Sequence, residues 1–306
     1  MVKQKFCVVS DGSCDVPEKT ALEYGVDVVH FLVSFDGVDY KREGVELSLP
    51  ELYRRMVEEP DVFPKTAAPP PEDFYEVFEK HAGRGEDILC VCISTKLSGS
   101  LQSAQIAAQM IKEQYPGIRV VAVDSLCCTL MQAAYVLEAC RMRDAGLSLA
   151  QTEAALESLR STGRILFTVG SLDYLRHGGR IGKVTQIAGT LLDLKPLITP
   201  QDGEIHSSGI RRGRKASLRG IAELLVSYLE DCGCRPEDCR ILIGYGHDEA
   251  EAEALQKITA ERLREVYGKE YAFPMFRIGA TIGVHAGPYS IGYGVIQKYG
   301  GEETVL

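Results

Sequence analysis

The feature that most constrains the fold is a regular alternation of apolar runs and helical patterns in the first half of the 306-residue chain. Four apolar runs predict strands, and several lack polar alternation, as expected where helices cover both faces of a sheet. These runs are FCVVSD (6–11), VDVVHFLVSF (26–35), ILCVCIS (88–94) and RVVAVDS (119–125). Helical patterns separate or follow them over 17–25, 48–59, 70–83, 97–115, 129–146 and 148–163. This order predicts a parallel sheet built from β-α-β units.

The order of elements changes after Gly163. A strand is expected over 164–170, followed by two short helices and a hairpin over 194–212 that turns at Asp202 and Gly203. Strands joined by a short turn are antiparallel, so this second sheet is mixed. Its later strands are expected within RILIGYGHD (240–248), AFPMFRIGA (272–280) and YGVIQKY (293–299).

The length of the chain favours two domains, because 306 residues exceed the size at which a protein usually keeps a single hydrophobic core. We expect an α/β protein with a three-layer α/β/α parallel-sheet domain at 1–163 and a mixed-sheet α/β domain at 164–306. In parallel α/β domains, ligands collect outside the carboxyl ends of the strands. The ligand is therefore expected beside the carboxyl ends of the strands in the first domain.

The charge balance excludes several classes of function. A formal net charge of -9 without a basic tract argues against nucleic acid as a partner, since phosphate binding needs clustered Lys and Arg. No segment approaches the ~18 uncharged apolar residues that span a bilayer, and the first apolar stretch is too short for a signal peptide. We expect a cytoplasmic protein that makes at most transient contact with a membrane.

Ten cysteines raise the question of a metal site. Most fall in apolar runs, where Cys packs as a small hydrophobe. Cys232, Cys234 and Cys239 in DCGCRPEDC resemble a metal cluster more closely, but zinc sites use four ligands and no obvious fourth lies nearby. A loop with reduced thiols is the alternative. We expect no metal and no cofactor.

Hydroxyl groups crowd the end of the third predicted strand, over 94–99 (STKLSG). A helix beginning near Ser98 would offer unpaired N–H donors beside these hydroxyls, an arrangement that favours a small anion. The alternative is that Ser98 only caps the helix. Asp15, two residues before Pro17, is likewise a plausible helix cap.

Nucleotide and serine-hydrolase motifs are missing from the sequence. It contains no G-x-x-x-x-G-K-[ST] and no G-x-G-x-x-G in a strand-to-helix turn, and each IGYG segment supplies only a G-x-G. Leu97-Ser98-Gly99 does not form a G-x-S-x-G elbow. Among six histidines, His285 stands out because it lies among small residues and next to a Pro-containing turn.

An ordered set of motifs resembles the DegV family of fatty-acid-binding proteins from near residue 8 to near residue 295. The motifs are SDGSCDVP, KTAAPPPEDF, ISTKLSGSLQSA, VVAVDS, LDYLRHGGRIG, GTLLDLKPLITPQDGEI and IGATIGVHAGP. The resemblance implies a two-domain α/β protein that holds one long-chain fatty acid between its domains. It also implies no catalysis by the chain alone, because bacterial relatives present the acid to a separate ATP-binding kinase subunit, which forms an acyl phosphate for phospholipid synthesis.

The resemblance also implies which residues form the site. Thr66 matches the Thr of the family's K-T-S-Q-P motif, and Ser94 with Thr95 match its paired hydroxyls, so these three, together with His285, are expected to bind the carboxylate. His285 matches the His of H-x-G-P near the head group, and Arg180 matches the Arg of G-G-R-I. For Arg180 and His285 we expect a role in phosphoryl transfer or in contact with the partner.

The chain also departs from the family pattern. Ala67 and Ala68 stand where relatives commonly have Ser-Gln, and Tyr289 follows Pro288 where relatives commonly have Gly, which is expected to narrow or reshape the mouth of the site. For the tunnel that holds the acyl tail, the candidates are the apolar runs at 26–35 and 187–198, with core packing as the alternative.

Two other functions fit the same features. One is a kinase subunit of the dihydroxyacetone-kinase type, whose fold the DegV family resembles. In that case His285 would hold a small carbonyl compound. The other is a carrier of a different apolar acid or an isoprenoid. The bound ligand itself discriminates among the three.

Overall fold

The computed structural model describes residues 6–182, 193–201 and 204–300. Its first sheet is entirely parallel, with the strand order β2-β1-β6-β7. The strands are β1 (Phe6–Asp11), β2 (Val26–Val29), β6 (Asp87–Cys92) and β7 (Val120–Asp124). The parallel sheet predicted for the first half of the chain is thus confirmed.

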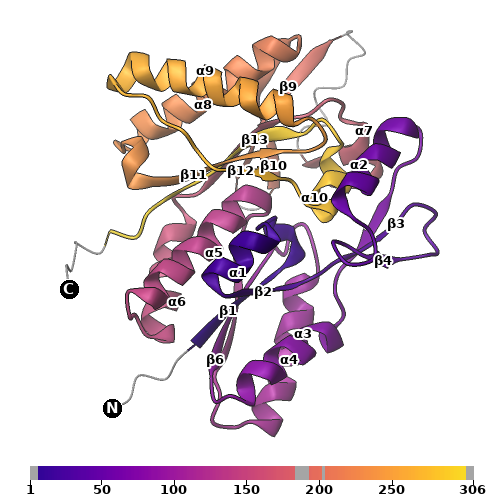
Figure 1. Cartoon of the computed structure of the whole chain (residues 1–306), viewed down its shortest axis with the longest axis vertical. Helices are drawn as coiled ribbons and strands as arrows, with labels where there is room; N and C mark the ends of the chain where they lie inside the picture. The colour runs from indigo at the N-terminus through magenta and orange to yellow at the C-terminus, as the bar shows by residue number, and fades with distance from the viewer. Residues whose placement is uncertain (1–5, 183–192, 202–203, 301–306) are drawn as a thin grey trace.

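Helices cover both faces of the parallel sheet (Figure 1). Cys7, Val9 and Cys90 face α3 (Pro71–Ala82) and α4 (Ser100–Gln114). Val8 and Val91 face the other group, which comprises α1 (Glu18–Tyr24), α5 (Thr129–Asp144) and α6 (Leu149–Arg160). Alternate residues of each strand are buried against opposite helices, which confirms the three-layer arrangement.

The second sheet is mixed and has the strand order β10-β9-β8-β13-β11-β12. Its strands are β8 (Arg164–Thr168), β9 (Leu194–Gln201), β10 (Glu204–Arg212), β11 (Cys239–Tyr245), β12 (Met275–Arg277) and β13 (Ile291–Gln297). The antiparallel β9–β10 hairpin is confirmed, and its predicted turn residues, Asp202 and Gly203, lie outside the described residues. One expected short helix is α7 (Asp173–His177).

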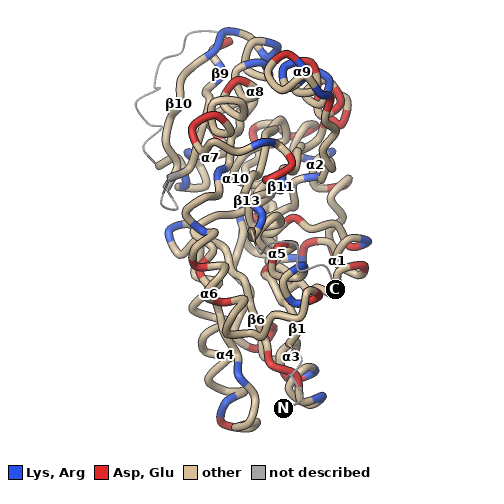
Figure 2. Tube along the Cα trace, turned by 90° about the vertical axis from the view of Figure 1, so that its left-hand side faces the viewer, with Lys and Arg blue, Asp and Glu red and all other residues tan. Residues whose placement is uncertain are grey.

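Two long helices, α8 (Arg214–Asp231) and α9 (Glu249–Tyr267), cover one face of the mixed sheet. Along α9, acidic and basic residues are interleaved (Figure 2); Arg262 pairs with Glu265 within the helix, and Arg264 pairs with Glu270, which follows it. The short helix α10 (Ala280–Ala286) lies between β12 and β13 in the sequence and packs against α7 and against elements of the first half.

A third, small sheet corrects one prediction. The run 26–35 is not one strand: β2 ends at Val29, and β3 (Leu32–Ser34) pairs instead with β4 (Lys41–Arg42) and β5 (Lys65–Ala67). Both halves of the run are apolar, but each has a different pairing partner, and an apolar run does not reveal where such a change occurs. The α2 helix (Leu49–Glu58) lies between β4 and β5 in the chain.

The helix α5 packs between the two large sheets, and 13 of its 16 residues are buried. A helix can approach a strand this closely only where the strand carries no side chain. A Cβ atom on Gly244 of β11 would lie 2.1 Å from Leu130, and one on Gly294 of β13 would lie 2.2 Å from the Leu130 and Met131 backbone. The repeated IGYG segments therefore serve helix packing. Among the described residues, no helix is both long and apolar enough to cross a membrane.

Candidate functional site

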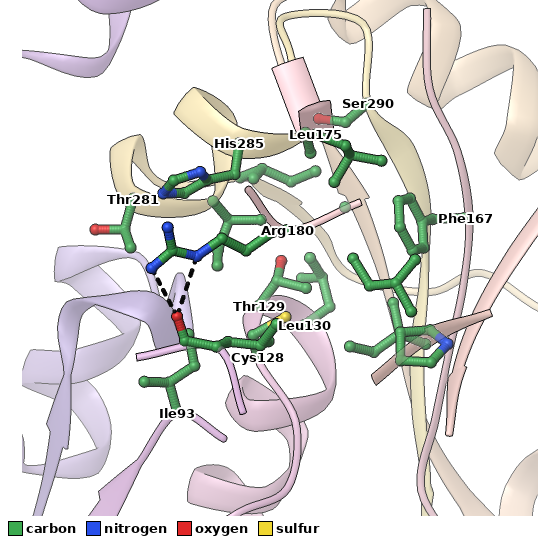
Figure 3. A pocket seen from close by; sticks show the side chains of 18 of the residues that line it. Ile93, Cys128, Thr129, Leu130, Phe167, Leu175, Arg180, Thr281, His285 and Ser290 are labelled. Atoms are coloured by element: carbon green, nitrogen blue, oxygen red, sulfur yellow. Dashed lines mark hydrogen bonds between the residues drawn. The ribbon is translucent and has the colours of Figure 1, made fainter. Parts of the chain in front are cut away.

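An apolar cavity of about 280 Å³ lies between the two large sheets. Its walls come from both halves of the chain (Figure 3) and include Ile93, Leu130, Ile165, Phe167, Ile282 and Ile291. The cavity follows β13 away from α10, because Ser290, Ile291, Gly292 and Tyr293 all line it in succession. Polar side chains gather near α10, so the cavity has one polar end and a longer apolar part.

The polar end is built around Thr66 and His285. The Thr66 Oγ1 atom lies 2.8 Å from His285 Nε2, which joins β5 of the small sheet to the last turn of α10. Gly178 makes room for the imidazole, since a Cβ there would lie 2.1 Å from His285 Nδ1. That Nδ1 atom is buried and has no hydrogen-bond partner among the described residues.

His285 is held in its neutral form. Burial and, to a smaller extent, the positive charge of Arg180 together lower its pKa from the ordinary 6.5 to about 4. At neutral pH only one ring nitrogen carries a proton. If that proton is on Nε2, His285 donates to Thr66, and the Thr66 hydroxyl keeps its own hydrogen for a ligand.

Arg180 lines the cavity at the same end (Figure 3). Its Nε and Nη2 atoms donate to the Leu97 carbonyl at 3.2 and 3.1 Å, and Nη1 donates to the Gly178 carbonyl at 2.6 Å. Arg180 is exposed, so it joins the 94–99 loop to the α7 segment while its charge faces solvent and the cavity.

The structure brings three of the five predicted site residues together and places two elsewhere. Thr66, Arg180 and His285 line the cavity, whereas Ser94 and Thr95 do not. The exposed Thr95 hydroxyl donates to Asp124 at 2.7 Å. Ser94 is fully buried and follows the wall residue Ile93 in the chain, and its oxygen accepts from the Lys96 amide at 3.2 Å. The hydrogen of the Ser94 hydroxyl is donated to no residue within the described ranges.

Ser98 lines the cavity instead, but it does not cap a helix. The helix α4 begins at Ser100 with Gly99 at the N-cap position and without a side-chain cap. The Ser98 oxygen accepts from the Ser100 amide at 3.3 Å, which makes a local turn before the helix. The predicted start near Ser98 is therefore two residues early.

Three buried carboxylates, which the sequence did not single out as site residues, lie behind the cavity wall. Asp11 accepts from the hydroxyl of Ser100 at the start of α4. Asp15, expected to cap the first helix, instead accepts from the hydroxyl of Thr129 at the start of α5 at 2.6 Å. Burial raises the pKa of each acid.

The third buried carboxylate is Glu43, which accepts from Thr281 near the start of α10. Burial raises its pKa as well. Within the described residues, no ion pair involves Glu43 or either buried Asp. A strand-end Asp is a usable sequence signal for Asp11, whereas Glu43 stands in a polar stretch, YKREGVE, that is typical of an exposed turn.

Two further expectations about the cavity need correction. From the run 26–35 only Phe31 lines it, and from 187–198 the described part, 193–198, contributes nothing. The rest of that range lies outside the described residues. Tyr289 lines a second cavity beyond Pro288 and not the mouth of this one.

The cysteines are all free, and Cys232, Cys234 and Cys239 lie together at the end of α8. Across the described parts of the chain, no group of three His, Cys, Asp or Glu side chains has a geometry that could hold a metal ion.

Residues 5–298 match the family model described as "Uncharacterised protein, DegV family". A DegV domain-containing protein of Clostridium perfringens is 30% identical over 286 residues, which cover 93% of this chain and 96% of that protein. A DegV domain-containing protein of Deinococcus radiodurans is 31% identical over 287 residues, covering 94% and 96% respectively.

Two solved structures share the whole fold. A stearic-acid-binding protein from Eubacterium ventriosum has a TM-score of 0.90 and 38% identity over 96% of this chain and 99% of that chain. A fatty-acid-binding DegV family protein from Thermus thermophilus has a TM-score of 0.83 and 31% identity over 96% of this chain and 100% of that one.

Proposed function

The chain belongs to the DegV family, and on that premise we propose that it binds one long-chain fatty acid and presents the carboxylate to a separate ATP-binding kinase subunit. The two similar structures are those of proteins described as binding stearic acid and fatty acid. The observation that carries the proposal is the cavity itself, whose wall is mostly apolar and whose polar end holds the Thr66–His285 pair. The protein alone would be a carrier and not an enzyme.

The apolar part of the cavity supports the tail assignment. Burial of an acyl chain contributes ~0.8 kcal/mol per methylene, so about fourteen methylenes contribute on the order of 11 kcal/mol before the cost of ordering the ligand. Ile165, Phe167 and Ile291 offer the apolar contacts that such a chain needs. A small carbonyl compound would leave most of this surface uncovered.

The polar end supports the carboxylate assignment. A buried carboxylate loses its hydration and needs hydrogen-bond donors in return. With the imidazole proton on Nε2, Thr66 accepts from His285 and donates its own hydrogen to the carboxylate. Ser94, which follows the wall residue Ile93 in the chain, and Ser98 at the wall are the further proposed donors. Thr95 is left out of the site, since its hydroxyl is used by Asp124.

Neutral donors also suit a carboxylate that must react. A buried cation paired with the carboxylate would hold the acid more firmly but would lower the nucleophilicity of the oxygen that attacks ATP. Hydroxyl groups and a neutral imidazole bind the anion with less of this cost. The attacking carboxylate oxygen would form a bond to the γ-phosphorus of ATP, and ADP would leave.

Arg180 is proposed to act at the phosphoryl-transfer step. It is the exposed cation at the polar end, and a guanidinium can stabilise charge on a transferring phosphoryl group or pair with a partner's carboxylate. Its bonds to two backbone carbonyls hold it in place before a partner arrives.

Head-group selectivity tests this function directly. Displacement of a fluorescent fatty acid should be measured for palmitate, hexadecanol and methyl palmitate, which share a tail and differ in the head group. We expect palmitate to bind at least tenfold more tightly than either neutral compound, because only the carboxylate makes charge-assisted hydrogen bonds. Equal affinities would contradict the carboxylate site, and a covalent adduct of His285 with an added carbonyl compound would favour the carbonyl-binding alternative.

A further inference from the structure

The helix that carries His285 does not cap its own N-terminus. The residue at the N-cap position of α10 is Gly279, which has no side chain to accept from the first N–H groups. Glu43 takes over this task from a distant part of the chain. Its Oε2 atom accepts from the Thr281 amide at 2.9 Å and from the Thr281 hydroxyl at 2.8 Å.

The same carboxylate also binds a second residue of the cavity wall. Glu43 Oε1 accepts from the Phe31 amide at 3.2 Å, and both Phe31 and Thr281 line the cavity. The carboxylate is packed tightly, since a Cβ on Gly12 would lie 1.9 Å from Oε1. Glu43 is 4% exposed, and no cation pairs with it in the described parts of the chain.

Burying a carboxylate without a counter-charge costs desolvation free energy, and this cost is large unless hydrogen bonds to the carboxylate offset it. Three donors and the positive end of a helix offset part of that cost for Glu43. An apolar side chain could fill the same space without the cost of burying a charge, but it could not bind the start of α10.

The position of Glu43 in the small sheet explains what this contact achieves. Glu43 directly follows β4, β4 pairs with β3, and β3 pairs with β5, which carries Thr66. One small sheet therefore contacts α10 at both ends: through Glu43 at its second residue and through Thr66 at His285. The orientation of α10 fixes the distance between the imidazole and the Thr66 hydroxyl.

We propose that Glu43 is a positioning residue that caps α10 and so holds His285 in hydrogen-bond contact with Thr66. It does not touch the ligand. The effect on fatty-acid binding rests on the proposed function, whereas the effect on His285 does not.

The test compares Glu43→Ala and Glu43→Gln with a matched control, Glu138→Gln. Glu138 is a fully buried glutamate of α5 that pairs with Arg141 and Arg240 and does not line the cavity. Two readouts apply to each variant: the pKa of His285 from NMR of the imidazole nitrogens without ligand, and the affinity for palmitate by displacement of a fluorescent fatty acid. His285→Gln assigns the His285 signals, and thermal unfolding establishes that each variant is folded.

In the wild-type protein the His285 pKa is expected near 4. Glu43→Ala should release α10, raise that pKa by at least one unit toward the ordinary 6.5 and weaken palmitate binding at least tenfold. Glu43→Gln keeps an oxygen for Thr281 but turns an N–H₂ group toward the Phe31 amide, so both effects should be smaller and in the same direction. Glu138→Gln should change neither quantity.

An unchanged His285 pKa in folded Glu43→Ala would overturn the proposal, as would an equal change in Glu138→Gln. If Glu43→Ala does not fold, Glu43→Gln decides in the same way. Wild-type protein that fails to bind palmitate would refute the proposed function, and the His285 titration would still decide whether Glu43 positions α10.

Discussion

Thr66 and His285 stand 219 positions apart in the sequence, and their side chains lie 2.8 Å apart. The first comes from β5 of the small sheet and the second from α10, which precedes the last strand of the mixed sheet. Neither half of the chain forms the polar end of the cavity by itself. The site therefore exists only when the two halves are packed together, and the hydrogen bond between Thr66 and His285 depends on that packing.

The first prediction concerns the hydroxyl of Thr66. Thr66→Val keeps the shape of the side chain and removes one charge-assisted hydrogen bond, worth roughly 1.5–3 kcal/mol, so fatty-acid affinity should fall about ten- to a hundredfold. Thr95→Val is the matched control, because its hydroxyl binds Asp124, and it should leave the affinity unchanged. Displacement titrations measure both. The reverse order of effects would place the carboxylate beside Thr95.

The second prediction concerns pH and His285. The folded protein holds the His285 pKa near 4, below the ordinary 6.5, so the unfolded chain binds a proton that the folded chain does not bind between these values. His285 therefore lowers the free energy of unfolding as pH falls from about 6.5 to about 4, by up to about 3 kcal/mol. His285→Gln lacks this loss. The unfolding free energy of wild type minus that of the variant should therefore decrease as pH falls through that window. Denaturant unfolding at several pH values measures it, and a constant difference would mean that His285 is not buried as a neutral ring.

The third prediction concerns Arg180. Arg180→Gln should bind palmitate within about threefold of wild type, because the tail supplies most of the affinity. It should lose most acyl-phosphate formation when mixed with an ATP-binding kinase subunit and Mg-ATP, since it lacks the cation proposed to stabilise the transferring group. Labelled phosphate transfer and binding should be measured on the same preparations. Binding and transfer that fall in equal proportion would mean that Arg180 only braces the 94–99 loop.

The fourth prediction concerns the apolar wall of the cavity. Ile165 lines it on β8, whereas Ile241 on β11 of the same sheet is equally buried in the core beneath α8 and α9. Truncating either residue to Ala should cost about 2–5 kcal/mol of stability. Only Ile165→Ala should shift the preference toward longer acyl chains, by up to about fourfold per added methylene that becomes buried. A set of saturated acids of increasing length measures this, and identical profiles in the two variants would place the tail elsewhere.

Much of the fold could be predicted from the sequence, because strands covered on both faces are continuous apolar runs and β-α-β order imposes a parallel sheet. The split of 26–35 could not be, because it depends on which strands the two halves meet in space. Each IGYG segment supplies only a G-x-G, and the packing of its glycine against α5 requires knowledge of the fold.

The sequence predicts which residues belong to the site better than it predicts which of them contact one another. Thr66, Arg180 and His285 were found through motifs, although nothing in the sequence pairs Thr66 with His285. Ser94 and Thr95 are expected to act together, but both lie beyond the end of β6 at Cys92, in a turn that buries Ser94 and leaves Thr95 exposed. Glu43 was missed because its burial results from contacts with α10 and Gly12, both distant in the chain.

The most direct test of the central claim is native mass spectrometry of protein purified without added lipid, followed by solvent extraction of the ligand. We predict one long-chain fatty acid per chain, held without a covalent bond and recovered intact in the extract. Thr66→Val should carry a smaller share of bound acid than wild type. Protein that remains free of fatty acid even after incubation with palmitate, or that carries an isoprenoid or an adduct on His285 instead, would contradict the account.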